Sequence, residues 1–161
     1  MPIAGKYDYR KGLLMKANVI VDADACPKNC LSILQKDQLK YKYRLITVAS
    51  YNHVINNEDH IIVGNEKDAA DMAVVNQVLR GDLVITQDWG LAALVLGKGG
   101  HVLSPSGRIY TNENIGFMLE ERAVKAKIRR SGQRTKGPAA RSHQDDQRFH
   151  RAFLDLLSKM E

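Results

Sequence analysis

Asn18-Val19-Ile20-Val21-Asp22-Ala23-Asp24-Ala25-Cys26-Pro27 is the stretch from which the fold can be read. Its opening run is rich in β-branched residues, which predicts a short buried strand that ends at Asp22. Pro27 suits the first turn of a helix, because a proline there loses no helical hydrogen bond and its φ is already helical. We expect that helix to run to about Leu39. The stretch therefore predicts a strand followed by a helix, with two aspartates at the junction.

The alternation of strand and helix continues beyond this first unit. Further buried strands are predicted at Arg44–Ala49, His60–Val63, Asp82–Thr86 and His101–Leu103. Helices are predicted at Lys67–Leu79 and Leu91–Leu96. Because this alternation is typical of a parallel sheet covered by helices, we expect a three-layer α/β fold with a central, mostly parallel sheet.

The chain changes character after Ser104-Pro105-Ser106-Gly107. Asn112 or Asn114 is expected to cap a helix that reaches about Lys127, whereas Arg129–Gln144 has few apolar anchors and is interpreted as a loop. Apolar residues then return at helical spacing, which predicts an amphipathic C-terminal helix that packs back on the domain; they are Phe149, Phe153, Leu154, Leu156 and Leu157. We divide the chain into a leader outside the fold at 1–14, an α/β domain at 15–128, and a basic loop with a C-terminal helix at 129–161.

Length and composition limit the class of protein. A chain of 161 residues, of which 44% are hydrophobic and 26% charged, fits one globular domain rather than two. It lacks the run of about 20 apolar residues that a membrane span needs, and its N-terminus lacks the apolar run of a signal peptide. Its two cysteines cannot form a disulfide framework. We expect a cytoplasmic protein with no membrane partner.

The net charge of +6 is distributed unevenly. Residues 122–151 contain ten Lys and Arg but two Asp, a local net charge of +8, so the rest of the chain carries −2. Clustered cations release counterions when they neutralise phosphates, which favours nucleic acid as a partner, with RNA favoured over DNA. A basic segment that only keeps the protein soluble is the alternative. The candidate nucleic-acid contacts are Arg129, Arg130, Arg134 and Lys136.

Five aspartates fall where parallel strands and a helix would bring them together. Asp22 and Asp24 follow the first strand and Asp88 follows a later one, and ligands of open α/β sheets bind at such carboxyl ends. Asp68 and Asp71, three residues apart at the start of a helix, share a face. Two unit charges about 4 Å apart repel by about 4 kcal/mol at an effective dielectric near 20, so a cluster favours a bound cation, and hard oxygen ligands select Mg²⁺ or Mn²⁺. Taken singly, Asp24 and Asp68 are equally well explained as residues that begin a helix.

Four motifs stand in order along the chain. They are Val21-Asp22-Ala23-Asp24-Ala25-Cys26-Pro27, Asp68-Ala69-Ala70-Asp71, Gly81-Asp82-Leu83-Val84-Ile85-Thr86-Gln87-Asp88 and Arg134-Thr135-Lys136-Gly137-Pro138. Together they resemble the YaiI/YqxD family of bacterial proteins, which is similar to PIN-like nuclease domains. The resemblance implies a PIN-like (Rossmann-like) domain with a metal-dependent nuclease-like site.

By this comparison Asp22 resembles the first-strand aspartate, Asp68 or Asp71 the acid on the helix, and Thr86-Gln87-Asp88 the late threonine-x-aspartate motif. In one departure, Trp89-Gly90-Leu91 follow Asp88, where PIN-like domains often carry another acid.

The convergence and the resemblance together predict a nuclease that uses Mg²⁺ or Mn²⁺. The expected metal ligands are Asp22, Asp68, Asp71 and Asp88, and the expected catalytic carboxylates are Asp22, Asp24, Asp71 and Asp88. The metal would polarise a phosphodiester and lower the pKa of a bound water, which attacks phosphorus. Thr86 is expected to orient one ligand without touching the metal.

Two other functions stay open at this point. Asp22-Ala23-Asp24 resembles the nucleophile and acid pair of haloacid-dehalogenase-like phosphatases. Those enzymes also carry a Gly-Asp pair at the end of an apolar strand, whereas Gly81-Asp82 precedes a strand here. The other alternative is a non-catalytic nucleic-acid-binding or regulatory domain in which the metal is only structural. Trp89 either packs at the junction of strand and helix or stacks on a base.

Overall fold

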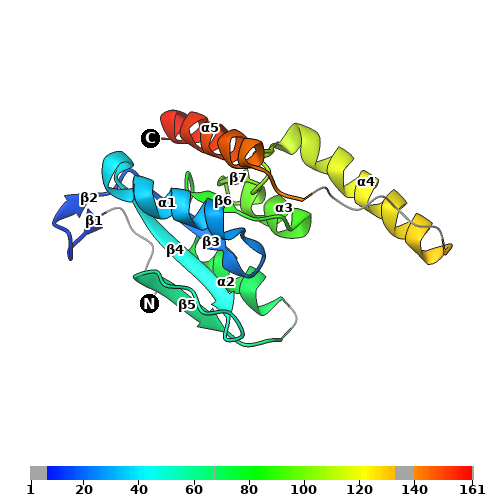
Figure 1. Cartoon of the computed structure of the whole chain (residues 1–161), viewed down its shortest axis with the longest axis horizontal. Helices are drawn as coiled ribbons and strands as arrows, with labels where there is room; N and C mark the ends of the chain where they lie inside the picture. The colour runs from blue at the N-terminus through cyan, green and yellow to red at the C-terminus, as the bar shows by residue number, and fades with distance from the viewer. Residues whose placement is uncertain (1–6, 67, 133–139, 161) are drawn as a thin grey trace.

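The computed structural model describes residues 7–66, 68–132 and 140–160, and Figure 1 shows how their helices and strands are arranged. The strands are β1 Tyr7–Asp8, β2 Leu13–Leu14, β3 Ala17–Asp22, β4 Tyr43–Ser50, β5 Asp59–Val63, β6 Leu83–Ile85, β7 His101–Leu103 and β8 Ile109–Tyr110. The helices are α1 Lys28–Tyr41, α2 Ala69–Gln77, α3 Trp89–Gly97, α4 Asn112–Arg130 and α5 His143–Lys159, and a short 3-10 helix, η1, spans Ala23–Ala25.

Within the described residues, the main sheet has the strand order β5-β4-β3-β6-β7-β8. Every neighbouring pair is parallel except β7 and β8, which are antiparallel. Helices α1, α2 and α3 each carry the chain back across the sheet between two strands, as parallel strands require, whereas a loop makes the return between β4 and β5. The predicted α/β fold with a mostly parallel sheet flanked by helices is confirmed.

Helices cover both faces of the sheet, and each face has its own hydrophobic core (Figure 1). In β3, Val19 and Val21 belong to the core under α1 and α5, whereas Ile20 belongs to the core under α2 and α3. This division reflects the alternation of side chains along a strand. All three side chains are fully buried, as expected for a central strand of a parallel sheet.

The C-terminal helix α5 closes the first of these cores. Phe149 and Phe153 are fully buried, and the ring of Phe153 lies edge-to-face against Tyr43 of β4 at 5.3 Å between centroids. Ser142 and Asp145 begin the helix with a capping box, in which each side chain accepts a hydrogen bond from the other residue's backbone N–H. Burial of large apolar side chains, worth about 1.5–3 kcal/mol each, thus holds α5 on the sheet.

Helix α4 differs from its expected bounds and extends away from the sheet (Figure 1). It is capped by Thr111, with Asn114 completing a capping box, so the expectation that Asn112 or Asn114 is the cap was wrong. It runs to Arg130, so Arg129 and Arg130 are helical rather than in a loop. The end of α4 is rich in Ala, Lys and Arg, which favour helix strongly enough to continue it. Despite the length of α4, none of the described helices combines the length and the apolar character that a membrane span requires.

Strands β1 and β2 form a hairpin that packs near the ends of β4 and β5. The buried carboxylate of Asp8 accepts hydrogen bonds from Arg10, and its Oδ2 lies 3.9 Å from Nε of Arg44 in β4. Arg10 also donates to Asp59 of β5 at 2.7 Å. The hairpin therefore belongs to the folded structure, in contrast to the leader expected at 1–14; residues 1–6 lie outside the described residues.

Candidate metal and catalytic site

The carboxyl ends of β3 and β6 bring two of the candidate segments together. The strands are parallel with Val21 opposite Ile85, so Asp22 and Thr86, the next residues, lie side by side. The Thr86 hydroxyl donates to Oδ2 of Asp22 at 2.9 Å and accepts the backbone N–H of Asp88 at 3.0 Å. Thr86 thus orients Asp22 and links it to the segment that carries Asp88.

Asp88 is fixed by the helix that it begins. Its Oδ1 accepts the backbone N–H groups of Gly90 at 2.8 Å and Leu91 at 3.1 Å, so Asp88 is the N-cap of α3. The partial positive charge of a helix N-terminus stabilises the ionised carboxylate. Asp88 is therefore held in place at the edge of the sheet.

Asp68 and Asp71 reach the same edge from the start of α2. Asp68 has a φ of 66° and a ψ of 6°, the left-handed conformation that residues other than glycine seldom adopt, and its side chain makes no capping hydrogen bond. Asp71 follows in the first turn of the helix. Capping by its side chain therefore does not account for Asp68, and backbone strain of this kind concentrates at functional sites.

Burial and mutual repulsion together raise the pKa values of two of these carboxyl groups. Burial, followed by the charges of Asp88, Asp22 and Asp68, raises the pKa of Asp71 to about 6. Burial also raises the pKa of Asp22, although the hydrogen bond from Thr86 opposes the shift. Burial is thus the largest cause of both shifts, and the charges of neighbouring carboxylates add to it.

The chemistry of this donor set fits a hard divalent cation. All four predicted ligands offer carboxylate oxygens, which suit Mg²⁺ and Mn²⁺. As the side chains stand, no three His, Cys, Asp or Glu residues in the described part of the chain are grouped closely enough to hold a metal ion. The carboxylates thus lie at the same edge of the sheet, but their present side-chain positions do not form a coordination shell for a metal ion.

Asp24 has partners of a different kind. The backbone N–H of Ser50 donates to both of its carboxylate oxygens, at 3.1 and 3.0 Å, and the Ser50 hydroxyl donates to Oδ1 at 3.2 Å. Nδ1 of His53 lies 2.5 Å from the same Oδ1. Asp24 is therefore engaged by the end of β4 and the loop after it. The sequence reasoning missed Ser50 and His53, and the available signal was that Ser50 directly follows a predicted strand and His53 comes three residues later.

These residues line one recess at the carboxyl edge of the sheet. A cavity of about 450 Å³ is bordered by Asp24, His53, Asp71 and Asp88, among others. A second of about 580 Å³ is bordered by Asp24, Asp88 and Trp89. Asp24 and Asp88 border both, so the two cavities adjoin, and together we call them the acidic recess.

A cavity with basic and aromatic walls adjoins the recess. It has a volume of about 550 Å³, and Trp89, Arg108 and Arg141 are among its lining residues. Arg141 is held there because it donates to the carbonyl of Pro105 at 2.8 Å and to Asp146 at 2.7 Å. Trp89 borders both this cavity and the acidic recess. Sequence reasoning did not select Arg108 or Arg141, since their positions depend on how distant segments pack.

Two of the predicted nucleic-acid contacts, Arg129 and Arg130, lie in the described part of the chain, and neither lines the acidic recess or the adjoining cavity. Arg129 and Arg130 are exposed in the last turn of α4. Arg134 and Lys136 lie outside the described residues. The basic surface at the end of α4 is thus a separate feature from the acidic recess.

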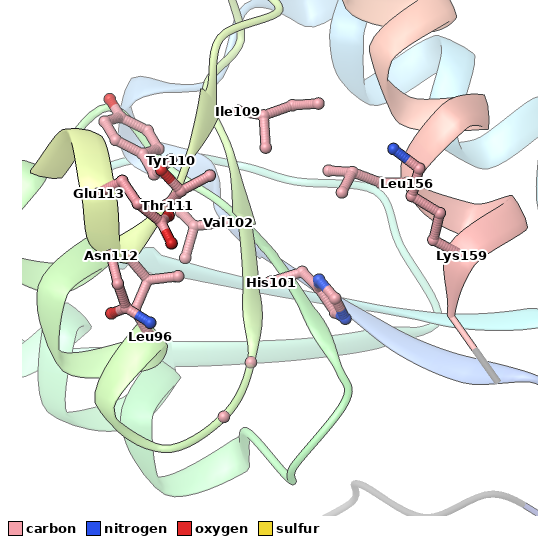
Figure 2. A pocket seen from close by; sticks show the side chains of 12 residues that line it. Leu96, His101, Val102, Ile109, Tyr110, Thr111, Asn112, Glu113, Leu156 and Lys159 are labelled. Atoms are coloured by element: carbon pink, nitrogen blue, oxygen red, sulfur yellow. The ribbon is translucent and has the colours of Figure 1, made fainter.

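A further hollow of about 420 Å³ lies beside β7 and β8 (Figure 2). His101, Tyr110 and Glu113 line it on one side, and Leu156 and Lys159 of α5 lie across from them. None of the candidate site residues in the described part of the chain borders this hollow. It is therefore unconnected with the carboxylate convergence.

Comparison with known proteins places the chain in a family. The family described as "Uncharacterized BCR, YaiI/YqxD family" matches residues 20–159. A UPF0178 protein of Heliobacterium modesticaldum is 45% identical over 139 residues, covering 86% of this chain and 95% of the relative.

Relatives from other bacteria have a comparable sequence identity to this chain. A UPF0178 protein of Alkaliphilus metalliredigens is 48% identical over 146 residues, covering 88% of this chain and 92% of the relative. One of Exiguobacterium sibiricum is 43% identical over 141 residues, covering 86% and 95%. No solved structure matches the chain. The chain belongs to the YaiI/YqxD family of uncharacterised bacterial proteins.

Proposed function

We propose that the protein hydrolyses phosphodiester bonds of nucleic acid with a divalent metal ion held at the carboxyl edge of the sheet. The observation that carries this proposal is the convergence of carboxylates from β3, α2 and the start of α3 on one recess, where burial and then the neighbouring charges raise the pKa of Asp71 to about 6. A like-charge cluster assembled from three elements costs stability without a cation. Perturbed carboxylates in a recess are also a common mark of a functional site.

The proposed ligands divide into a fixed pair and a movable pair. Asp22 and Asp88 are fixed by Thr86 and by the N-terminus of α3. Asp68 and Asp71 lie at the start of α2, and their side chains must rotate to complete the coordination. When bound, the metal supplies a water of lowered pKa and polarises the phosphodiester. The fixed pair sets where the reacting phosphorus lies.

The adjoining cavity supports nucleic acid as the substrate class. Trp89 offers a ring on which a base can stack, and Arg108 and Arg141 offer cations for phosphates. A small phosphomonoester would need neither the aromatic wall nor a second cavity. We therefore propose a single-stranded nucleic acid that passes from the aromatic and basic cavity into the acidic recess.

The phosphatase alternative is disfavoured by the position of Asp82. Asp82 precedes β6, at the amino end of the sheet, where its carboxylate accepts hydrogen bonds from Asn18 and from the backbone N–H of Leu79. It lies at the end of the sheet opposite to Asp22. These contacts explain Asp82 as a structural residue that ties the end of α2 to β3.

The test combines metal binding with cleavage. Mn²⁺ at about a hundredfold excess over its dissociation constant should stabilise the protein by about 2.7 kcal/mol, and the protein should cleave labelled single-stranded RNA or DNA. Asp22→Asn and Asp88→Asn should each reduce both effects; asparagine is as good an N-cap as aspartate, so α3 is preserved in the second variant. Asp155→Asn, at an exposed position on α5, is the matched control and should behave as wild type.

Each other outcome points to a different function. Unchanged Mn²⁺ affinity in both variants contradicts the proposed site. Mn²⁺ binding without cleavage indicates the non-catalytic domain. Release of phosphate from phosphomonoesters, with a covalent phosphate trapped on Asp22, indicates a phosphatase.

A further inference from the structure

We infer that His53 donates the proton that the leaving oxygen of the phosphodiester needs, and that Asp24 and Ser50 position it; the inference rests on the proposed function. His53 is assigned no role by the sequence motifs. Its place in the structure, in the acidic recess and against Asp24, gives it one.

The contact with Asp24 determines which ring nitrogen is available. An ionised carboxylate only accepts hydrogen bonds, so at 2.5 Å from Asp24 the Nδ1 of His53 is the donor. Nε2, on the other side of the ring, is then the nitrogen that can act on a substrate. Asp24 is itself held by three hydrogen bonds from Ser50, so it positions the imidazole as a carboxylate does in other histidine-dependent sites.

The loop that carries His53 is held as well. The backbone N–H of His53 donates to the carbonyl of Ser50 at 3.1 Å, which closes a turn directly after β4. Asn65, beyond β5, accepts a hydrogen bond from the side chain of Asn52 at 3.1 Å and donates one to the Tyr51 hydroxyl at 2.9 Å. Hydrogen bonds on both sides of the loop thus reduce its freedom before any ligand arrives.

Among the described residues of this cavity, no other side chain is suited to the task. Among the described residues that line the cavity, the other ionisable groups are carboxylates: Asp24, Glu66, Asp68, Asp71 and Asp88. Asp68, Asp71 and Asp88 are proposed metal ligands, and a carboxylate that holds a metal ion is anionic and has no proton to give. Histidine is the side chain best suited to exchange a proton near neutral pH. His53 is therefore the candidate donor in this cavity.

Its place along the sheet suits a leaving oxygen rather than an attacking water. The fixed pair Asp22 and Asp88 lies at the ends of β3 and β6, whereas His53 follows β4, on the other side of β3. Water is activated at the carboxylates, and the displaced oxygen departs toward the β4 side. As the phosphorus–oxygen bond breaks, its electron pair stays on the leaving sugar oxygen, which takes the Nε2 proton of a doubly protonated His53 ring. The ring is left neutral, with its remaining proton on Nδ1 against Asp24. The attacking water gives its hydroxyl group to phosphorus and its proton to solvent, which later reprotonates His53.

The first test varies the leaving group. With Mn²⁺, His53→Ala should slow cleavage of a single-stranded oligonucleotide, whose sugar alkoxide needs a proton, by about 10²–10⁴-fold. Hydrolysis of bis(p-nitrophenyl) phosphate, whose leaving group is a weak base, should change by less than about tenfold. Added imidazole should restore part of the oligonucleotide cleavage. His143→Ala, at an exposed position at the start of α5, is the matched control and should leave both rates unchanged.

The outcomes separate this inference from the proposed function. If His53→Ala slows both substrates equally, or neither, His53 is not the proton donor although the enzyme is a nuclease. If wild-type protein hydrolyses neither substrate with Mn²⁺, the proposed function fails and the inference falls with it.

A second test needs no turnover. Nitrogen-15 NMR of the metal-free protein, with His53 neutral, should show the proton on Nδ1, and Asp24→Ala should shift the tautomer toward Nε2. A proton on Nε2 in the wild type would overturn the arrangement from which the inference starts.

Discussion

At the scale of one residue, the raised pKa of Asp71 shows that its charged form is disfavoured in the acidic recess. Its pKa is raised to about 6 from an ordinary value of 3.8, first by burial and then by neighbouring carboxylates. Between these two values folding takes up a proton, because the folded state binds it more tightly than the unfolded chain does. The contribution of Asp71 to stability is therefore fully present below pH 3.8 and is lost as the pH rises through about 6.

Replacing Asp71 tests this repulsion directly. At pH 8, with EDTA present, Asp71→Asn should melt about 2–4 °C above wild type, which for a chain of this size corresponds to about 1 kcal/mol after allowance for solvent screening. At pH 4 the difference should shrink, since the wild-type carboxyl group is then protonated. Thermal unfolding followed by circular dichroism at both pH values measures the effect. Equal melting temperatures at pH 8 would show that the carboxylates do not repel one another.

At the scale of elements, the β1–β2 hairpin is held by charge rather than by apolar burial. Asp8 is 1% exposed and receives the guanidinium of Arg10, and Arg44 of β4 donates to the carbonyl of Tyr7 at 3.1 Å. Burial alone would raise the pKa of Asp8, but the hydrogen bonds and charge of Arg10 lower it below its usual value. The buried carboxylate of Asp8 thus faces Arg10 in the turn of the hairpin and Arg44 in the main sheet.

Removing that anion should destabilise the protein. Asp8→Ala leaves the buried partners of the carboxylate without it, and we expect a loss of about 1–3 kcal/mol in the free energy of unfolding. Glu58→Ala is the matched control: Glu58 pairs with Arg10 at 3.2 Å but is 57% exposed, so its loss should cost less than about 1 kcal/mol. Urea unfolding of the three proteins gives the values. Equal stability of Asp8→Ala and wild type would place the hairpin outside the cooperative fold.

At the scale of the whole molecule, opposite charges are separated. The acidic recess lies at the carboxyl edge of the sheet, whereas Lys127, Arg129 and Arg130 occupy the last turn of α4, a helix that extends from the body (Figure 1). A basic helix end attracts a polyanion over a distance, and a carboxylate recess admits a phosphodiester only with a cation. The basic end of α4 is thus suited to binding a polyanion, and the acidic recess is suited to cleavage.

This division predicts how salt affects binding. The double substitution Arg129→Ala and Arg130→Ala should reduce the slope of log affinity for single-stranded RNA against log salt by about 0.7 for each phosphate that the variant no longer neutralises, and Mn²⁺ binding should not change. Replacing Lys36 and Lys40, two exposed cations of α1, by alanine is the charge-matched control and should leave the slope closer to that of wild type. Fluorescence anisotropy at several salt concentrations measures the slopes. The same slope in all three proteins would make the end of α4 a solubility feature.

Local pattern was enough to predict most of the fold. The β-branched run before Asp22 and the proline at Pro27 predicted β3 and α1 closely, because strand and helix periods are properties of neighbouring residues. The approach of Asp22 to the segment that carries Asp88 was also predictable, since parallel strands end at the same edge of a sheet. The proposed metal ligands thus follow from sequence alone, although their coordination of a metal stays a prediction.

The tertiary structure decided what those side chains meet. An aspartate has the same local pattern whether it joins a cluster or pairs with a histidine, so only folding showed that Asp24 contacts Ser50 and His53. In the same way Asp8 appears in the sequence as an ordinary polar residue, and it is buried because Arg10 and Arg44 approach it from different segments. Such partners are chosen by the packing of distant elements, and the free energy of burying a charge depends on them rather than on neighbouring residues in the chain.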